Sequence, residues 1–478
     1  MRKPVIGLAM VGTLSAVFAL ASWVDVHAGT LEATGAQIGN PAGGQSWIEE
    51  LEGRGLTPSL EWDADIFINA RGGRSQGAVV DGLVKLGLDI DGQGLTGLGL
   101  LSNTDIHVEG YYPYGTNISE HVGDLAGVNG NTAYNSPRLY ELWFQKSFQV
   151  GPVVNSFRIG LMGADQEFDV NSTAEWFINT SFGAPLALGG NAPVPVYPFT
   201  ALGIRLELSI GDDKDLKLTL RSGVFDGNSA APTLDPVAVG SPTAPASPAY
   251  NKYGVDFHFN PSTGLIFLNE LVFDFLNREP PGIPPPGPGR WFFGPGHFLI
   301  GGFYATNRFD NIYQERLRVL GIGASLQAVG KESGDYGVYA LWEQKIYEAA
   351  PVSPDGLYLF TRGLVLPKDR NVDTVSAETG AVYKGVFRRQ KELRDSIGVG
   401  FAYNSISDNV RRADDVARRE GVPNVPDLRF ESVLEATYLC PITAHWQLQP
   451  DFQWVIRPGA SDSLRNAVVI GLRSILTF

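Results

Sequence analysis

The stretch Val468-Val-Ile-Gly-Leu-Arg-Ser-Ile-Leu-Thr-Phe478 alternates in polarity and is the strongest indication of fold class in this 478-residue chain. One face carries mostly apolar residues (Val468, Ile470, Leu472, Leu476 and Phe478), and the other carries mostly small or polar ones (Val469, Gly471, Arg473, Ile475 and Thr477). A period of two is typical of a β-strand, because successive side chains point to opposite faces. A length near ten residues suits a tilted strand that crosses a bilayer. The stretch therefore predicts a transmembrane strand, although strands of soluble sandwiches alternate as well.

Both ends of the sequence agree with export to an outer membrane. Phe478 resembles the terminal aromatic residue by which outer-membrane β-barrel proteins are delivered to their assembly machinery. At the other end, Arg2 and Lys3 precede an almost uninterrupted apolar run and a small-residue cleavage site. We therefore expect residues 1–28 to be a secretory signal peptide. No later segment supplies the uninterrupted apolar residues that a transmembrane helix needs.

The composition narrows the class of protein further. Fifty-seven glycines, 11% aromatic residues and many alternating stretches favour a transmembrane barrel over a periplasmic or secreted protein. The net charge of −14 argues against nucleic-acid binding, which needs a basic footprint. The single Cys440 excludes an intramolecular disulfide.

Residues 29–60 are predicted to form a separate N-terminal segment, which lies in the periplasm or the barrel lumen or is a mobile linker. Ser46 precedes Trp47, and Glu49 follows three positions after Ser46, which is the pattern of a capping box at the start of a short helix. Gly53 and Gly55 are expected to end this helix. The remaining residues, 61–478, are assigned to the barrel.

Alternating stretches recur along residues 61–478. The predicted strands include Leu86–Ile90, Leu98–Val108, Leu139–Phe148, Phe157–Met162, Gly203–Ile210, Leu216–Arg221 and Tyr253–Phe259. In an outer-membrane barrel the apolar face meets lipid and the polar face lines water. Candidate aromatic residues at the membrane rim are Trp143, Trp342 and Trp454. These patterns predict an all-β fold, a transmembrane antiparallel β-barrel of about sixteen strands with a short N-terminal helix.

Two stretches are predicted to be long extracellular or infolded loops. Residues 226–250 are rich in Ala, Pro, Ser and Gly, and residues 279–290 are dominated by proline and glycine. Proline lacks the N–H donor of a β-ladder, so neither stretch fits inside a strand.

Several local blocks form an ordered set along the chain: Arg138–Gln145, Phe157–Gly160, Glu167–Asp169, Trp176–Gly183, Pro195–Pro198, Ala201–Arg205, Gly223–Gly227, Gly356–Arg362, Pro367–Asn371 and Leu448–Gly459. Together these blocks resemble the carbohydrate-selective porin family called OprB. Their order is that of the family, and they span most of residues 60–478. The resemblance implies a passive outer-membrane sugar channel with sixteen strands. The loop at 229–249 and the proline-rich insertion at 280–288 depart from the family pattern, which leaves substrate preference open.

The alternation also predicts which polar residues face the lumen and contact sugar. These pore-lining candidates are Arg158, Arg205, Glu207, Arg221, Asp256, Arg362, Glu431, Glu435, Gln449, Asp451 and Gln453. Charged and amide groups exchange hydrogen bonds with sugar hydroxyls, while aromatic rings offer flat surfaces to the apolar faces of pyranose rings. The plainer alternative is that most of them line a wet wall or pair with one another.

No residue pattern points to an enzyme, a cofactor or a metal. The six histidines lie in no recognised nucleophile motif, and one cysteine with scattered histidines gives no ligand spacing for zinc. The expected partners are small-molecule sugars, outer-membrane lipid and the barrel assembly machinery, with no nucleic acid, and the chain is expected to be a monomer or a homotrimer. The expected function is passive diffusion of monosaccharides such as glucose across the outer membrane of a Gram-negative bacterium. The alternatives are a general-diffusion or polysaccharide-export barrel and a secreted, soluble carbohydrate-binding β-protein.

Overall fold

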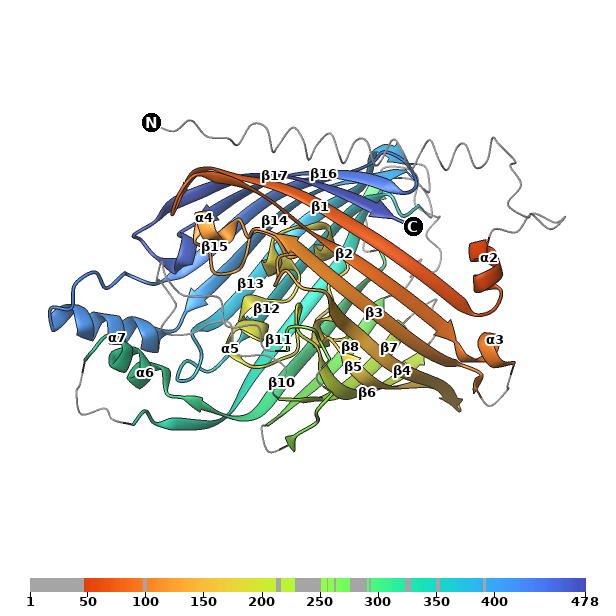
Figure 1. Ribbon diagram of the computed structural model, residues 1–478, viewed down its shortest axis with the longest axis horizontal. Helices are drawn as coiled ribbons and strands as arrows, with labels where there is room; N and C mark the ends of the chain where they lie inside the picture. Colours follow the sequence, from red (N-terminus) through yellow and green to blue (C-terminus); the bar gives the residue numbers. More distant parts are fainter. Residues whose placement is uncertain are drawn as a thin grey trace. The chain divides into compact units, whose positions relative to one another are not determined.

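The structure is a computed structural model of the 478-residue chain. It describes residues 47–97, 101–211, 216–227, 251–255, 257–261, 264–275, 290–291, 294–322, 328–349, 353–389 and 393–478. The chain divides into two units, of which the second comprises Gly55–Phe478 and contains the entire sheet (Figure 1).

The second unit is a closed antiparallel barrel. Its sheet has seventeen strands, of which β9 (Arg290–Trp291) has two residues and pairs with β11, and the other sixteen form the wall. These are β1 (Leu56–Gly73), β2 (Gly77–Asp91), β3 (Thr104–Gly115), β4 (Arg138–Val150), β5 (Val153–Met162), β6 (Ala201–Gly211), β7 (Leu216–Asp226), β8 (Leu265–Phe275), β10 (Gly296–Asp310), β11 (Lys331–Glu348), β12 (Gly356–Val365), β13 (Asp373–Arg389), β14 (Arg394–Ile406), β15 (Phe430–Pro441), β16 (Trp446–Ile456) and β17 (Arg465–Thr477). The predicted all-β barrel of sixteen strands is confirmed.

Closure joins the first strand to the last. β1 pairs with β17 through partners such as Ile66 and Leu472, and it pairs with β2 on its other side. The backbone amides and carbonyls of Leu60 and Phe478 bond to each other at 3.1 and 2.9 Å, so the seam continues to the last residue. A closed barrel leaves no unpaired edge in the membrane.

The two ends of the barrel differ in their connections. At one end, where β1 begins and β17 ends, β4 and β5 are joined by a two-residue turn. The opposite end carries the segments 116–137 and 163–200 and the helices α6 (Ile312–Val319) and α7 (Asp408–Arg419) (Figure 1). Outer-membrane barrels have short periplasmic turns and long extracellular loops, so we assign the end with α6 and α7 to the cell exterior.

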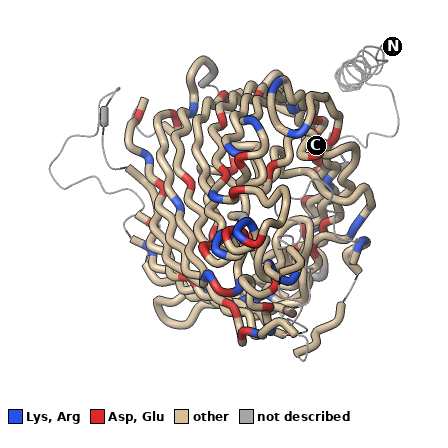
Figure 2. Tube along the Cα trace, turned by 90° about the vertical axis from the view of Figure 1, so that its left-hand side faces the viewer, with Lys and Arg blue, Asp and Glu red and all other residues tan. Residues whose placement is uncertain are grey.

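The alternation of β6 shows how the sequence produces the two barrel faces. Ile204 and Leu206 are exposed on the outside, while Arg205 between them is buried on the inside. Apolar residues that are exposed to water would be costly, but on this face they meet lipid. Viewed from the end that carries α6 and α7, segments with both acidic and basic residues lie within the ring of strands (Figure 2).

Two long segments fold back into the barrel. Residues 116–137 include α4 (Ser119–Val122), and residues 163–200 include three short 3-10 helices and α5 (Leu186–Asn191). Their apolar side chains pack on the inner wall, as Phe182 does against Phe360 of β12. Gly400 of β14 makes room for this packing, because a Cβ there would lie 2.7 Å from the Phe182 ring. The lumen is thus narrowed by loops that are bound to the wall.

The remaining helices of the described chain are short. α6 and α7 pack together through the buried ion pair of Arg316 and Asp414, at 2.7 Å. α3 (Gly92–Thr96) lies between β2 and β3, with Asp91 as its N-cap. α2 (Trp47–Glu52) belongs to the first unit and closes with a bond from the Gly53 amide to the Glu49 carbonyl, so the predicted short helix is present. None of the helices in the described ranges is both long enough and apolar enough to cross a membrane.

Some expected strands and boundaries differ from the structure. Tyr253–Phe259 was predicted as a strand, but its described residues form turns and irregular chain, because Gly254 has a left-handed φ of +66° that breaks an extended run. The predicted strand Leu98–Val108 is wrong at its start, since β3 begins only at Thr104. β1 begins at Leu56, so residues 56–60 belong to the barrel rather than to the N-terminal segment. The predicted signal peptide, the proposed cap Ser46 and most of the two proline-rich loops lie outside the described residues.

Candidate functional site

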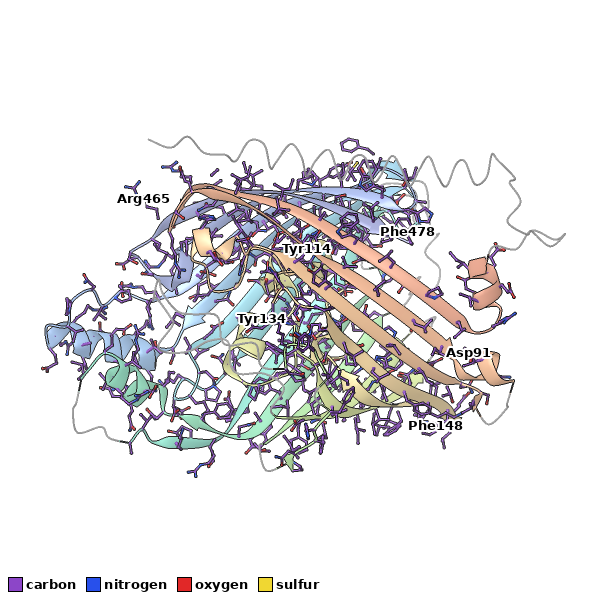
Figure 3. All side chains as sticks on the ribbon, in the orientation of Figure 1. Asp91, Tyr114, Tyr134, Phe148, Arg465 and Phe478 are labelled. Atoms are coloured by element: carbon purple, nitrogen blue, oxygen red, sulfur yellow. The ribbon has the colours of Figure 1, made fainter. Side chains whose placement is uncertain are left out.

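A cavity of about 550 Å³ opens on the inner wall near the end where β1 begins and β17 ends. It is lined by Ser59, Leu60, Glu61, Lys85, Asp89, His107, Glu109, Tyr111, Glu141, Trp143, Arg158, Gln166, Glu167, Thr477 and Phe478. Five neighbouring strands, β1 to β5, supply most of these residues, and β17 and the segment 163–200 supply the rest. The labelled Phe478 and Asp91 lie toward this end of the barrel, away from α7 (Figure 3).

One side of the cavity carries pairs of opposite charge. Lys85 Nζ lies 2.6 Å from Glu61 Oε1 across the β1–β2 pair. His107 Nδ1 lies 2.7 Å from Asp89 Oδ1, and its Nε2 lies 4.0 Å from Glu109 Oε2. These groups offer both hydrogen-bond donors and acceptors to a solute in the cavity.

Trp143 lies between two cationic or polar side chains. The His107 ring stacks on it at 5.0 Å between centroids, and the Arg158 guanidinium carbon lies 3.5 Å from the ring centroid. β3 and β5 flank β4, so these two groups approach the indole from opposite sides. Its Nε1 donates to Glu141 at 2.9 Å. Trp143 was expected at the membrane rim, but it faces the lumen, and neither ring face is open to a sugar.

Arg158 also joins a cluster that fixes the loop in the lumen. Both Arg158 and Arg205 form ion pairs with Glu167, which belongs to the segment 163–200. Gln145 accepts hydrogen bonds from both arginines at 3.0 Å. A carboxylate shared by two guanidinium groups is held firmly, because charge-assisted bonds are the stronger class. The cluster thereby positions one wall of the cavity.

Several predicted pore-lining carboxylates bind the backbone of the infolded segments. Glu431 accepts from the amides of Leu125, Ala126 and Gly459 at 2.7–3.0 Å. Glu435 accepts from the amides of Ile178 and Asn179 at 2.6 and 3.0 Å. Both glutamates are inaccessible to solvent, so their role is to anchor loops.

Arg362 is a cation that anchors the segment 163–200, as Glu435 does with a negative charge. It pairs with Glu378 at 2.5 Å and donates to the carbonyls of Ser181, Phe182 and Gly183 at 2.7–3.3 Å. Its side chain is fully enclosed by the wall and the loop.

The other pore-lining candidates that the structure describes lie outside the cavity. Glu207 pairs with Arg221 at 2.8 Å, and Arg221 reaches Glu270 at 3.0 Å. Gln453 is bonded to the loop carbonyl of Val128 and to Asp451, and Gln449 is bonded to the carbonyl of Trp176. Asp256 lies outside the described residues. Of the pore-lining candidates that the structure describes, only Arg158 lines the cavity. Sugar binding by any of these candidates stays a prediction.

Sequence reasoning missed most of the cavity. Glu61 alternates with apolar residues of β1, and Lys85, His107 and Glu109 occupy inward positions of β2 and β3. The alternation that identified other strands could have found them. Gln166 belongs to the infolded loop, which has no period of two, and no sequence signal located it.

Burial changes the proton affinity of two acids in the loop. Asp165 is enclosed by the loop and the wall, and desolvation raises its pKa to about 7. Desolvation likewise raises the pKa of Asp169 to about 8, although Arg362 opposes the shift. Within the described ranges, no group of three or more acids, histidines or cysteines could hold a metal ion.

Comparison with known proteins gives one consistent result. A family model described as "Carbohydrate-selective porin, OprB family" matches residues 75–478. Porin B of Pseudomonas aeruginosa is 24% identical over 188 residues, which cover 37% of this chain and 40% of that protein. Porin AaxA of Chlamydia pneumoniae is 32% identical over 127 residues, or 25% of each protein, so the chain matches less than half the length of either relative. The high-pH structure of Pseudomonas putida OprB, 21% identical, has a TM-score of 0.71 and covers 90% of this chain and 96% of its own. At that identity, the structural likeness concerns the fold.

Proposed function

Because the chain belongs to the OprB family of carbohydrate-selective porins, we propose that it lets monosaccharides such as glucose diffuse passively across the outer membrane of a Gram-negative bacterium. The family and the barrel fold are those of a channel. The selective step is assigned to the cavity lined by β1 to β5.

The cavity chemistry is the observation that carries this proposal. Glu61, Glu109 and Glu141 are acceptors, and Lys85 and Arg158 are donors, within one space of about 550 Å³. A sugar hydroxyl both donates and accepts, so a wall that mixes the two can replace its water shell. The groups are already paired with one another, which keeps each contact weak enough for release.

Aromatic contact comes from Tyr111 rather than from Trp143. The Tyr111 ring lines the cavity and stacks on Tyr140 at 4.1 Å, so one face of the ring is covered. Tyr197 lies 6.0 Å from the same ring, and Glu109 is a hydrogen-bond partner of the Tyr111 hydroxyl, so a solute meets the part of the ring that borders the cavity.

Liposome swelling tests the proposal. Purified protein should admit glucose faster than empty liposomes do, and Glu109→Gln should change the rate because it removes a cavity acceptor. Glu420→Gln, an exposed loop change beyond α7, is the matched control and should behave as the unaltered protein. Glucose entry no faster than through protein-free bilayers would reject the sugar channel.

The rival functions make different predictions in the same system. A general-diffusion pore would pass amino acids and salts as freely as glucose, and glucose would not block its ion current. A polysaccharide-export barrel needs a wide passage, whereas segments 116–137 and 163–200 occupy this lumen. The soluble alternative is disfavoured by the exposed apolar outer face, as at Leu206.

We propose that the barrel also works with lipid and with the outer-membrane assembly machinery. The closed wall is complete within one chain, so a monomer suffices for transport, and a homotrimer would package three such channels. Cross-linking in native membranes measures which of the two forms is present.

A further inference from the structure

Arg138, at the start of β4, is an exception among the buried arginines. Four arginines of the described chain are buried, and three of them (Arg205, Arg316 and Arg362) pair with carboxylates at 2.7 Å or less. Arg138 is 5% exposed, and its Nε and Nη2 atoms have no hydrogen-bond partner among the described residues. A buried guanidinium without an acceptor is costly, because it has lost its hydration.

Aromatic rings surround this guanidinium. Its central carbon lies 5.5 Å from the centroid of Phe199, whose ring meets Tyr134 edge-on at 6.2 Å. The titratable side chains that act on it electrostatically are Tyr134, Tyr140 and Tyr197, and none of them is a carboxylate. The Tyr140 hydroxyl is also buried without a partner. The site therefore presents hydrogen-bond donors and a positive charge without a matching anion.

The complementary ligand is an anion with two oxygens in one plane. Arg binds a carboxylate through two parallel N–H···O bonds, and the free Nε and Nη2 atoms form one edge of that fork. The phenol of Tyr140 can donate to a further oxygen. Rings such as Phe199 suit the apolar face of a sugar that carries the carboxylate.

The site lies on the way to the cavity. Arg138 begins β4 at the long-loop end, and Glu141 and Trp143 of the cavity follow toward the opposite end. Tyr111 is the cross-strand partner of Arg138 and lines the cavity itself. Tyr134 lies midway along the barrel (Figure 3). Arg138 thus lies between the long-loop end of the barrel and the cavity.

We propose that Arg138 is a binding subsite for the carboxylate of an acidic sugar, such as a uronate or an aldonate. The inference rests on the proposed channel function and deepens it, because it adds acidic sugars to the neutral ones. The net charge of −14 would otherwise disfavour such solutes. One unpaired cation on the path offsets this repulsion.

Single-channel current block measures the subsite directly. Glucuronate should block the ion current of the unaltered protein at a concentration at least about tenfold below that of glucose or of glucuronate methyl ester. Arg138→Gln removes the charge and the guanidinium fork but leaves a polar side chain, and it should erase this difference while leaving glucose block unchanged. Arg429→Gln is the control, because Arg429 is exposed and pairs with Asp427 in the loop that precedes β15.

Three outcomes would overturn the proposal. Equal block by glucuronate and its methyl ester in the unaltered protein would do so without any variant, which covers the case that Arg138→Gln fails to fold. Equal loss of glucuronate and glucose block in Arg138→Gln would show general damage to the pore. A changed reversal potential in a KCl gradient with unchanged glucuronate block would assign Arg138 to inorganic anions. Failure of the channel function itself would be seen separately, as absent glucose entry in the swelling assay.

Discussion

Replacing Arg362 by alanine is expected to release the infolded segment 163–200 from the wall. The guanidinium pairs with Glu378 at 2.5 Å and donates to four loop carbonyls, including those of Asp169 and Gly183. Hydrogen bonds from a charged donor contribute about 1.5–3 kcal/mol each, but lumen water would replace part of this. Leaving Glu378 buried without its partner costs roughly 3–5 kcal/mol on its own. We therefore expect Arg362→Ala to reduce the free energy that holds the segment 163–200 on the wall by roughly 3–5 kcal/mol.

Single-channel recording reads this loss as a change in the pore. Arg362→Ala should raise the mean conductance and add current fluctuations, since the segment no longer narrows the lumen. The conductance of Arg362→Lys should lie between that of the unaltered protein and that of Arg362→Ala, because lysine keeps the charge but cannot reach four carbonyls at once. Arg429→Ala removes an exposed arginine and should change neither property. Unaltered conductance and unaltered thermal unfolding in Arg362→Ala would refute the anchoring role.

Three further predictions concern the membrane face, the loop acids and the seam. Leu206→Arg should destabilise the barrel by roughly 2–4 kcal/mol if the residue lies near the bilayer midplane, whereas Glu207→Gln on the opposite face should spare assembly and change ion selectivity. Urea titration in lipid vesicles measures the stability of both variants, and the reversal potential in a salt gradient measures ion selectivity. The reverse pattern would mean that the strand is inside out. The pKa of Asp169 rises from about 3.8 to about 8 when the loop docks, so the protonated carboxyl favours docking. This contribution to the docking free energy is fully present below about pH 3.8 and is lost as the pH rises through 8. Current fluctuations should therefore grow between pH 5 and pH 9 and grow less in Asp169→Asn, where Asp165 of the same loop still titrates near 7. An undiminished pH response in that variant would assign the response to Asp165 or another group. Deleting Phe478 removes two backbone hydrogen bonds to Leu60 at the seam and should lower the amount of protein in the outer membrane, whereas Phe478→Ala keeps both bonds and should leave that amount unchanged. Equal amounts of the two variants in membrane fractionation would argue against a role for the seam.

The wall could be predicted from the sequence because its cause is local. In β6, Ile204 and Leu206 alternate with Arg205 and Glu207, and lipid on one side and water on the other select that pattern directly. The strand patterns predicted about sixteen strands, and the family-like blocks implied the same number. Tyr253–Phe259 shows the limit of this reasoning, since its alternation is as clear but Gly254 turns the chain.

The lumen could not be predicted, because its contacts join residues far apart in sequence. Glu435 belongs to a strand whose alternation is visible in the sequence, yet its partners are amides of Ile178 and Asn179, which no period or motif marks. The helix α7 was not predicted from the sequence for another reason. Its apolar side consists of Val410, Ala413 and Ala417, a faint signal among many charges.

The way the loops are attached has a consequence for how this channel can change over evolution. Glu431, Glu435 and Arg362 hold the infolded segments through main-chain amides and carbonyls, which every residue type except proline can supply in full. The side chains of those segments are thus largely not needed to hold the segments on the wall. Mutation can exchange them and alter what the pore admits while the loop keeps its position. The same separation makes 163–200 a suitable target for laboratory selection of new solute preferences on an unchanged barrel.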